Sequence, residues 1–173
     1  LKKNQKLVNN MLTPTTKEEH HDRPISPAEI VSENWMTQED WDYCSEKAME
    51  LFEFGQKKAK ENGMILVDTK YEMGIDEDGN ILLIDEIHTP DSSRYWVSKG
   101  YKERFELGED QLMLDKENIR QWLIGKGFSG EGIPPELNDE IRVSLSKSYM
   151  DLFKKLTGSD FNLVIGDVSS RIN

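Results

Sequence analysis

Cysteine is almost absent from this sequence, since Cys44 is the single example in 173 residues. A disulfide framework and a zinc site built on thiolates are therefore excluded. A reducing compartment fits this composition. We expect the cytoplasm, or an organelle such as a plastid if a targeting segment lies upstream of residue 1.

Long apolar runs and an excess of positive charge are also missing. No stretch approaches the ~20 apolar residues that a helix needs to cross a bilayer, and no signal-peptide pattern is present. The chain carries 33 acidic against 22 basic residues, and its formal net charge of -11 argues against binding to nucleic acid or to an anionic membrane. We expect small-molecule partners. The oligomeric state stays open, a homo-oligomer included.

The remaining composition is that of a folded domain. Hydrophobic residues make up 36% of the chain, with four Trp, five Tyr and six Phe, which is too aromatic for a disordered protein. The length suits a single domain over residues 1–173. We predict an α+β fold in which about three helices pack on a small antiparallel sheet that contains a Leu66–His88 hairpin.

The three helices are predicted from their start and stop signals. Thr37 and Gly63 bound the first, because Thr is a good N-cap and Gly a common terminator. The second is "KENIRQWLI", capped by Asp115, and the third runs from the Pro134–Pro135 pair to Gly158. The segment before Thr37 and the stretch after Arg94 show no sustained period, which predicts extended or irregular chain.

The hairpin is predicted from two strand-like segments, "MILVDTKYEM" and "NILLIDEIH", which flank the turn signal Asp78–Gly79. Such a dipeptide favours a two-residue type I′ loop. That register sets Glu72 opposite Asp85, with Lys70 and Asp68 on the same face. Like charges directly opposite one another destabilise a strand pair by up to about 1 kcal/mol, so we expect a cation to join them.

Two carboxylates from adjacent strands, with no thiol nearby, suit Mg²⁺. This ion commonly takes one or two protein carboxylates and completes its shell with water and nucleotide phosphates. Glu72 and Asp85 are therefore candidate metal ligands and ATP-binding residues, and Lys70 is a candidate to neutralise a substrate anion. A hairpin with a solvated, charged face fits the pattern equally well, and a slip of one residue removes the opposition.

The segment "TPDSSR" follows the hairpin and presents two hydroxyls and a guanidinium together. Arg94 offers a planar fork for phosphate, and serine hydroxyls with backbone amides complete such a cradle. Simple turn chemistry is the alternative interpretation. Of the histidines, adjacent His20 and His21 point to opposite sides of an extended chain and predict no zinc site, while His88 is expected to pack or cap the back of the hairpin.

At this point the motifs resemble a known family. "TPTTKEEHHDRPIS", "GMILVDTKYEMG", "LLIDEIHTPDSSRYW" and "DKENIRQWL" occur in this order between Thr13 and Leu123. They resemble segments of the phosphoribosylaminoimidazole-succinocarboxamide synthase, or SAICAR synthetase, family. The resemblance implies a purine-biosynthesis ligase that uses ATP and Mg²⁺ to join L-aspartate to carboxyaminoimidazole ribonucleotide (CAIR) through an acyl phosphate.

The resemblance also implies roles for individual residues. Glu72 and Asp85 match the nucleotide and Mg²⁺ positions, with Lys70 beside them in the catalytic group. Arg94 is the leading candidate for the 5′-phosphate of the ribonucleotide. The other positions grouped around this substrate are Asp68, Lys70, Asp91, Ser92 and Ser93, and the further candidates for the aspartate or carboxylate end are Lys17, Asp22, Lys116 and Arg120, each with a solvated surface residue as its alternative.

The fold implied by the resemblance is a two-part, ATP-grasp-like or kinase-like structure. This chain would supply its central and C-terminal portion, since the family's N-terminal β-rich part, which covers the nucleotide, has no counterpart here. Two alternatives to the ligase stay open. One is a kinase-like phosphotransferase that uses the same carboxylates, and the other is a non-catalytic ribonucleotide-binding fragment.

Overall fold

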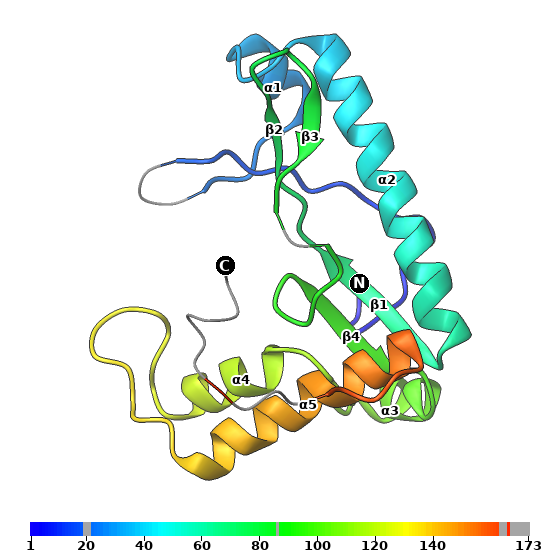
Figure 1. Ribbon diagram of the computed structural model, residues 1–173, viewed down its shortest axis with the longest axis vertical. Helices are drawn as coiled ribbons and strands as arrows, with labels where there is room; N and C mark the ends of the chain where they lie inside the picture. Colours follow the sequence, from blue (N-terminus) through cyan, green and yellow to red (C-terminus); the bar gives the residue numbers. More distant parts are fainter. Residues whose placement is uncertain (19–21, 86, 163–165, 167–173) are drawn as a thin grey trace. The chain divides into compact units, whose positions relative to one another are not determined.

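The computed structural model describes residues 1–18, 22–85, 87–162 and 166, and has both helices and strands (Figure 1). The chain divides into two compact units, Leu1–Met113 and Leu114–Asn173. The prediction of an α+β fold with small antiparallel sheets is confirmed. Within the described ranges, no helix is long and apolar enough to cross a membrane.

Helix α2, Gln38–Glu61, is the longest element of the first unit, and its predicted ends are confirmed. The Thr37 hydroxyl accepts a hydrogen bond from the Asp40 amide at 3.1 Å, so one free helix donor is satisfied. Gly63 lies just past the helix with a positive φ of 69°. Before α2, residues Pro27–Ser32 form a six-residue helix, α1, although extended chain was predicted there. This helix forms because Ser26 and Glu29 complete a capping box at its start.

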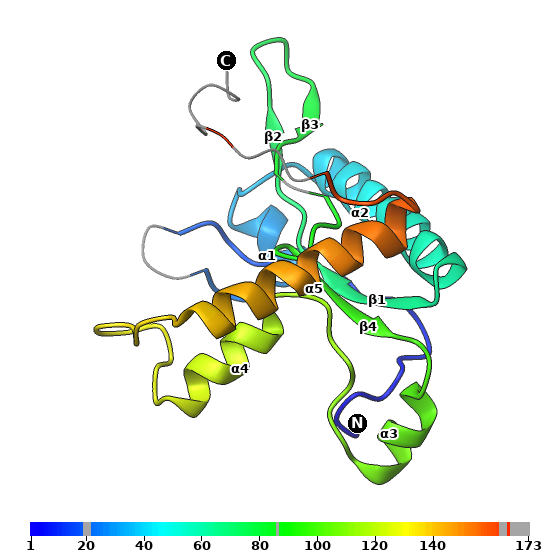
Figure 2. The same cartoon turned by 60° about the horizontal axis from the view of Figure 1, so that its bottom comes forward.

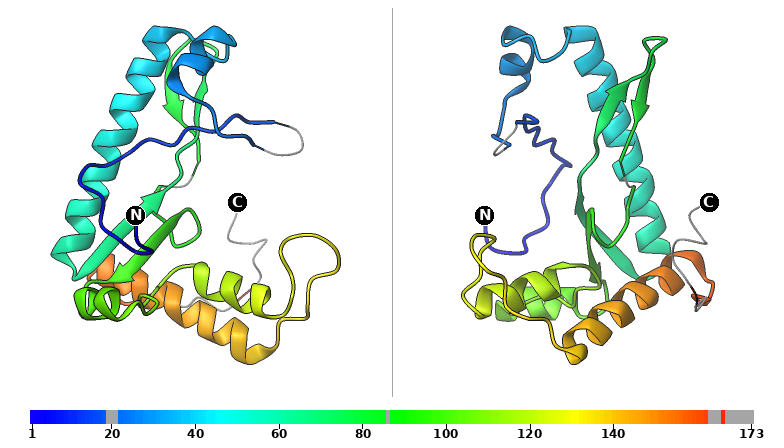
Figure 3. Two further views of the ribbon diagram at one scale, coloured as in Figure 1. Left: turned by 180° about the vertical axis from the view of Figure 1, so that it is seen from behind. Right: turned by 60° about the vertical axis from the view of Figure 1, so that its left-hand side comes forward.

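Strand β1, Met64–Thr69, pairs antiparallel with β4, Ser93–Val97, and not with the strand predicted from the hairpin. The stretch after Arg94, predicted as loop with short elements, contains the rest of this strand and also helix α3, Tyr101–Leu107. Side chains of β1 and β4 alternate between buried and exposed, and Leu66 and Tyr95 are directly paired and almost fully buried. Helix α2 packs on β1, as the two views of Figure 3 show.

A second two-stranded sheet joins β2, Met73–Ile75, to β3, Ile81–Leu83. The predicted two-residue loop is wrong. Asp76 closes a three-residue loop because its carboxylate accepts hydrogen bonds from the backbone amides of Asp78 and Asn80, and Gly79 takes the left-handed conformation with φ 84°. The register therefore slips by one residue.

The second unit contains helices α4, Glu117–Gly125, and α5, Asp139–Thr157, which pack against each other (Figure 2). Asp115 accepts a hydrogen bond from the Glu117 amide at 2.7 Å, although the N-cap position belongs to Lys116. The predicted start of α5 at Pro134–Pro135 is wrong, since the helix begins after Asn138, whose side chain accepts from the Ile141 amide. Its predicted end at Gly158 is confirmed.

Candidate active site

Glu72 lies at the centre of a charged cluster in the first unit. Its Oε1 atom is 2.8 Å from the ammonium nitrogen of Lys17 and 2.8 Å from that of Lys70. Hydrogen bonds from Lys17 and Lys70 lower the pKa of Glu72 to about 2. The hydrogen bond between Lys17 and Glu72 also raises the pKa of Lys17. The carboxylate is therefore ionised at neutral pH, and Lys17 stays charged beside it.

Two further carboxylates complete this cluster. Asp22 Oδ2 lies 3.8 Å from Lys70 Nζ, and its Oδ1 accepts a hydrogen bond from the Glu18 amide at 3.2 Å. Asp22 and Asp85 both contribute to the raised pKa of Lys17, after the larger effect of Glu72. Lys17 thus contacts one carboxylate directly and is influenced by two more from separate segments.

The predicted opposition of Glu72 and Asp85 across a strand pair is wrong. The Glu72 carbonyl accepts a hydrogen bond from the Ile84 amide at 3.0 Å, so Ile84 takes the place expected for Asp85. The cause is the longer loop at Asp76, which shifts the pairing by one residue. Asp85 still contributes to the raised pKa of Lys17, the residue that binds Glu72.

Asp68 and Arg94 form a two-point ion pair at the adjacent sheet. Arg94 Nε donates to Asp68 Oδ1 at 3.0 Å, and Arg94 Nη2 lies 2.6 Å from Asp68 Oδ2. Both side chains are about half exposed, so the pair remains accessible to a ligand. The geometry follows from the strand register, in which Asp68 and Arg94 are direct partners.

A row of hydroxyl groups lies beside this ion pair. Thr69 Oγ1 is 2.8 Å from Ser93 Oγ, which is 3.3 Å from Ser92 Oγ, which in turn is 3.2 Å from Thr89 Oγ1. Ser93 is buried, whereas Ser92 is partly exposed and Asp91 is exposed. The Lys70 amide donates to the Ser92 carbonyl at 3.1 Å, which ties the hydroxyl row to the strand that leads to Glu72.

Thr69 and Thr89 were not among the residues predicted for the site. Thr69 was placed on the face opposite to Asp68 and Lys70, and nothing in the sequence linked it to Ser93. The signal that could have found Thr69 is its pairing with Ser93, one position along from the Asp68–Arg94 pair. That register is visible only once β1 is paired with β4.

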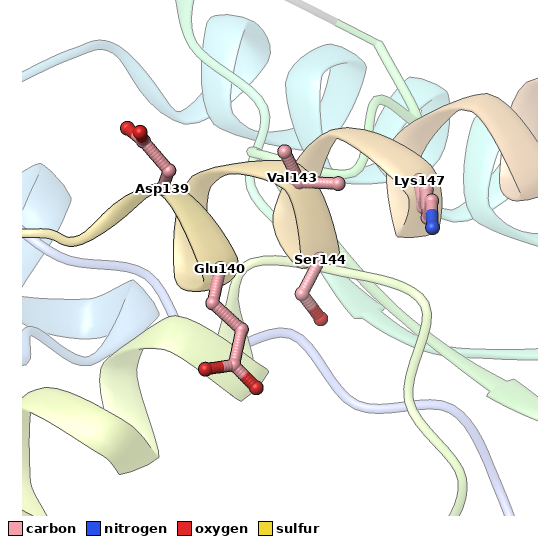
Figure 4. Close-up of a pocket in the computed structure, with 5 residues that line it drawn as sticks. All are labelled: Asp139, Glu140, Val143, Ser144 and Lys147. Atoms are coloured by element: carbon pink, nitrogen blue, oxygen red, sulfur yellow. The ribbon is translucent and has the colours of Figure 1, made fainter.

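Lys116 and Arg120 belong to the second unit, at the start of α4. Arg120 Nη1 lies 3.7 Å from Glu117 Oε2, and the arginine side chain is largely exposed. Asp115 is fully buried. A shallow hollow on α5, lined by Asp139, Glu140, Val143, Ser144 and Lys147, contains none of the predicted site residues (Figure 4).

The donor set of the cluster fits a hard divalent cation. Glu72 and Asp85 offer carboxylate oxygens, and one or two protein carboxylates suffice for Mg²⁺ when phosphates and water complete its shell. Among the described residues, no group of three or more His, Cys, Asp or Glu side chains could hold a metal by itself. His20 and His21 lie outside the described residues, and the expectation that they form no zinc site remains a prediction.

His88 packs against Tyr71 and helix α2, and so has the packing role that was predicted, although not at the back of the predicted hairpin. It is half-buried, and burial lowers its pKa. Its Nε2 atom lies 2.6 Å from the Tyr71 hydroxyl, and the two rings meet edge to face at 5.7 Å. The ring also approaches Gly55 of α2, where an added Cβ would come within 2.5 Å of His88 Cε1.

Comparisons with known proteins agree with the motifs. Residues 1–134 match the profile of the SAICAR synthetase family. A phosphoribosylaminoimidazole-succinocarboxamide synthase of Legionella pneumophila (strain Paris) is 52% identical over 163 residues, which cover 93% of this chain and 52% of the relative. A chloroplastic synthase of Arabidopsis thaliana is 51% identical over 165 residues, 95% of this chain and 40% of the relative.

Solved structures give the same result. The structure described as SAICAR-synthase from Saccharomyces cerevisiae complexed SAICAR has a TM-score of 0.75 at 35% identity, and covers 94% of this chain and 51% of its own. A SAICAR synthetase in complex with ADP has a TM-score of 0.66 at 25% identity, and covers 91% of this chain and 55% of its own. The chain spans about half the length of the curated relatives it matches in these comparisons. From its motifs, its fold and the matched residues, this chain belongs to the SAICAR synthetase family.

Proposed function

We propose that this chain provides the metal and ribonucleotide side of an ATP-dependent ligase that joins L-aspartate to CAIR, giving SAICAR, ADP and phosphate in purine biosynthesis. The observation that carries the proposal is the adjacency of a candidate metal-binding cluster and a candidate phosphate-binding arrangement. The Glu72 cluster and the Asp68–Arg94 pair with its hydroxyl row are linked by the short segment from Asp68 to Glu72. The named ligands of the yeast structure and of the ADP complex support this pairing of sites.

In this proposal Glu72 and Asp85 hold Mg²⁺. When bound, the ion neutralises the ATP phosphates and orients the phosphoryl group that is transferred. Lys17 and Lys70 hold anionic groups next to these carboxylates. The phosphoryl group passes from ATP to the CAIR carboxylate, the amine of aspartate attacks the resulting acyl phosphate, and phosphate leaves. Most of the catalysis is positioning and charge neutralisation.

The ribonucleotide is proposed to bind at the end of β1 and β4. Arg94 contacts its 5′-phosphate with two donors, which a planar guanidinium does better than an ammonium group. Partly exposed Ser92 and exposed Asp91 are proposed to contact the same ligand, while buried Ser93 holds Ser92 in place. Asp22 is proposed for the aspartate or carboxylate end, and the same role for Lys116 and Arg120 rests on the motif resemblance alone.

We further propose that both units of the chain function as one domain, the central and C-terminal portion of an ATP-grasp-like or kinase-like fold. The half-length coverage of the relatives favours a second candidate function for residues 1–173 taken alone, a ribonucleotide-binding fragment without turnover. The cytoplasm or a plastid remains the proposed location, and the chloroplastic name of the Arabidopsis relative supports the plastid.

An assay of ATP-dependent aspartate incorporation tests the proposal. The complete gene product is incubated with CAIR, Mg²⁺, ATP and labelled L-aspartate, and is compared with Leu1–Asn173 alone. We expect labelled product from the complete gene product. CAIR binding without turnover by Leu1–Asn173 would support the fragment function, and ATP hydrolysis or CAIR phosphorylation at the same rate without aspartate would point to a kinase-like phosphotransferase.

A further inference from the structure

The segment between the two sheets is held in an unusual way. Three successive residues, Lys70, Tyr71 and Glu72, contact three residues that are spaced four positions apart in the sequence. The Lys70 amide donates to the Ser92 carbonyl, the Tyr71 hydroxyl meets His88 Nε2, and the Glu72 carbonyl accepts from the Ile84 amide. In a regular ladder, three successive residues face three successive residues. Here the three partner residues are separated by extra residues, and Tyr71–His88 is the middle one of the three contacts.

His88 is fixed from several sides. Its backbone has a positive φ of 57°, a conformation that is unfavourable for a non-glycine residue and persists only where the surroundings impose it. The hydroxyl of Tyr95, a core residue, donates to the His88 carbonyl at 3.0 Å. The ring of His88 lies against Gly55, where no side chain would fit.

The Tyr71–His88 pair touches neither of the proposed ligand sites. Tyr71 lies between Lys70 and Glu72 in the sequence, and the next residue after His88 is Thr89, the end of the hydroxyl row. A hydrogen bond at this place connects the segment that carries Glu72 to the turn that carries Ser92. It therefore adds a side-chain link to the backbone hydrogen bond that joins Lys70 to Ser92.

We propose that Tyr71 and His88 are positioning residues, which hold the metal-binding carboxylates at the correct distance from the ribonucleotide-binding turn. The inference rests on the proposed function, because it assumes that two ligands bind and react across this distance. It predicts a specific kinetic result. Each ligand keeps its own contacts, so each should bind normally, whereas the reacting groups are misplaced relative to each other, and an error of about 1 Å can cost 100-fold in rate.

The test uses Tyr71→Phe and His88→Asn in the complete gene product. Tyr71→Phe removes only the hydroxyl and keeps the ring contact. His88→Asn keeps a residue that tolerates positive φ, but its amide is too short to reach Tyr71. We expect kcat to fall about 10- to 100-fold in each variant while the Kd of MgADP and that of CAIR each change less than about twofold. The double variant should match the single variants, since both remove the same bond.

Tyr101→Phe is the matched control, because it also removes a tyrosine hydroxyl. That hydroxyl donates to the Asn4 carbonyl at 2.7 Å, and neither residue is proposed to contact a ligand. It should leave kcat unchanged. Unchanged kcat in Tyr71→Phe would overturn the inference, as would a fall in melting temperature with a parallel loss of affinity for both ligands, which is the result expected for general loosening.

Hydrogen–deuterium exchange provides a readout that does not depend on turnover. Tyr71→Phe should speed exchange in peptides that contain Lys70–Glu72 and Ser92, and Tyr101→Phe should not. If the wild-type protein fails to incorporate aspartate, the proposed function fails, and exchange still decides whether the pair holds the two segments together. Equal exchange in the wild type and in Tyr71→Phe overturns the inference even if the ligase activity is found.

Discussion

Gly55→Ala should destabilise the protein, although the same change usually stabilises a helix. Alanine gains about 1 kcal/mol over glycine in a helix interior. At Gly55, however, the new Cβ would lie 2.5 Å from His88 Cε1, 2.8 Å from His88 Nε2 and 2.7 Å from Leu66 Cδ2. Overpacking of this kind costs about 1–3 kcal/mol. Moving the ring would also break the hydrogen bond to Tyr71, worth about 1 kcal/mol. The net destabilisation is about 1–3 kcal/mol.

Equilibrium urea denaturation, followed by tryptophan fluorescence, measures this change. Gly125→Ala is the matched control, since Gly125 is also helical and its added Cβ meets no atom within 4 Å. It should be neutral or stabilising. In a His88→Asn background the clash with the ring disappears, so the cost of Gly55→Ala should shrink. A gain in stability from Gly55→Ala alone, or an equal cost in both backgrounds, would refute the reasoning.

Three other predictions concern the charged groups of the site. The Glu72 carboxyl should titrate near pH 2 in a carbon-13 NMR experiment, and its pKa should shift toward the ordinary value of 4.5 in Lys17→Met. Because the pKa is lowered in the folded state, the contribution of Glu72 to stability is present above pH 4.5 and is lost as the pH falls toward 2. An unchanged pKa would show that Lys17 is not the main cause. Arg94→Lys should raise the KM for the ribonucleotide about tenfold, because the two-point geometry seen with Asp68 is lost while the charge is kept; an unaltered KM removes Arg94 from that role. Asp85→Asn should weaken binding of the Mg²⁺-nucleotide far more than binding of the ribonucleotide in titration calorimetry, and similar losses for both ligands would contradict its place in the metal site.

Local signals in the sequence predicted helix α2 well. Its N-cap at Thr37 and its stop at Gly63 act within one helical turn, so they do not depend on the rest of the fold. The start of α5 was less visible. The Pro134–Pro135 pair resembles a helix start, yet the cap that satisfies the first amides is Asn138, three residues later.

Strand pairing could not be predicted from the same kind of signal. The hairpin register depends on Asp76, whose carboxylate competes with the ladder for backbone amides and so lengthens the loop by one residue. The pairing of β1 could not be predicted either, because its partner β4 is distant in the sequence. The charged residues that the structure brings together around Glu72 and Arg94 were among those chosen by residue type, and their roles stay predictions. Their contacts could not be predicted, because Glu72 reaches Lys17 across 55 residues of sequence.

The row of hydroxyls from Thr69 to Thr89 has a directional property. Each hydroxyl has a single proton, so once Ser92 donates outward to an anion, it cannot also donate to Ser93 or Thr89. The remaining protons must then turn to suit, and each bond polarises the next. The affinity for an anion at Ser92 therefore depends also on Thr69, which lies two hydroxyls away at the other end of the row. Mutating only the residues that touch the ligand would not reveal this contribution.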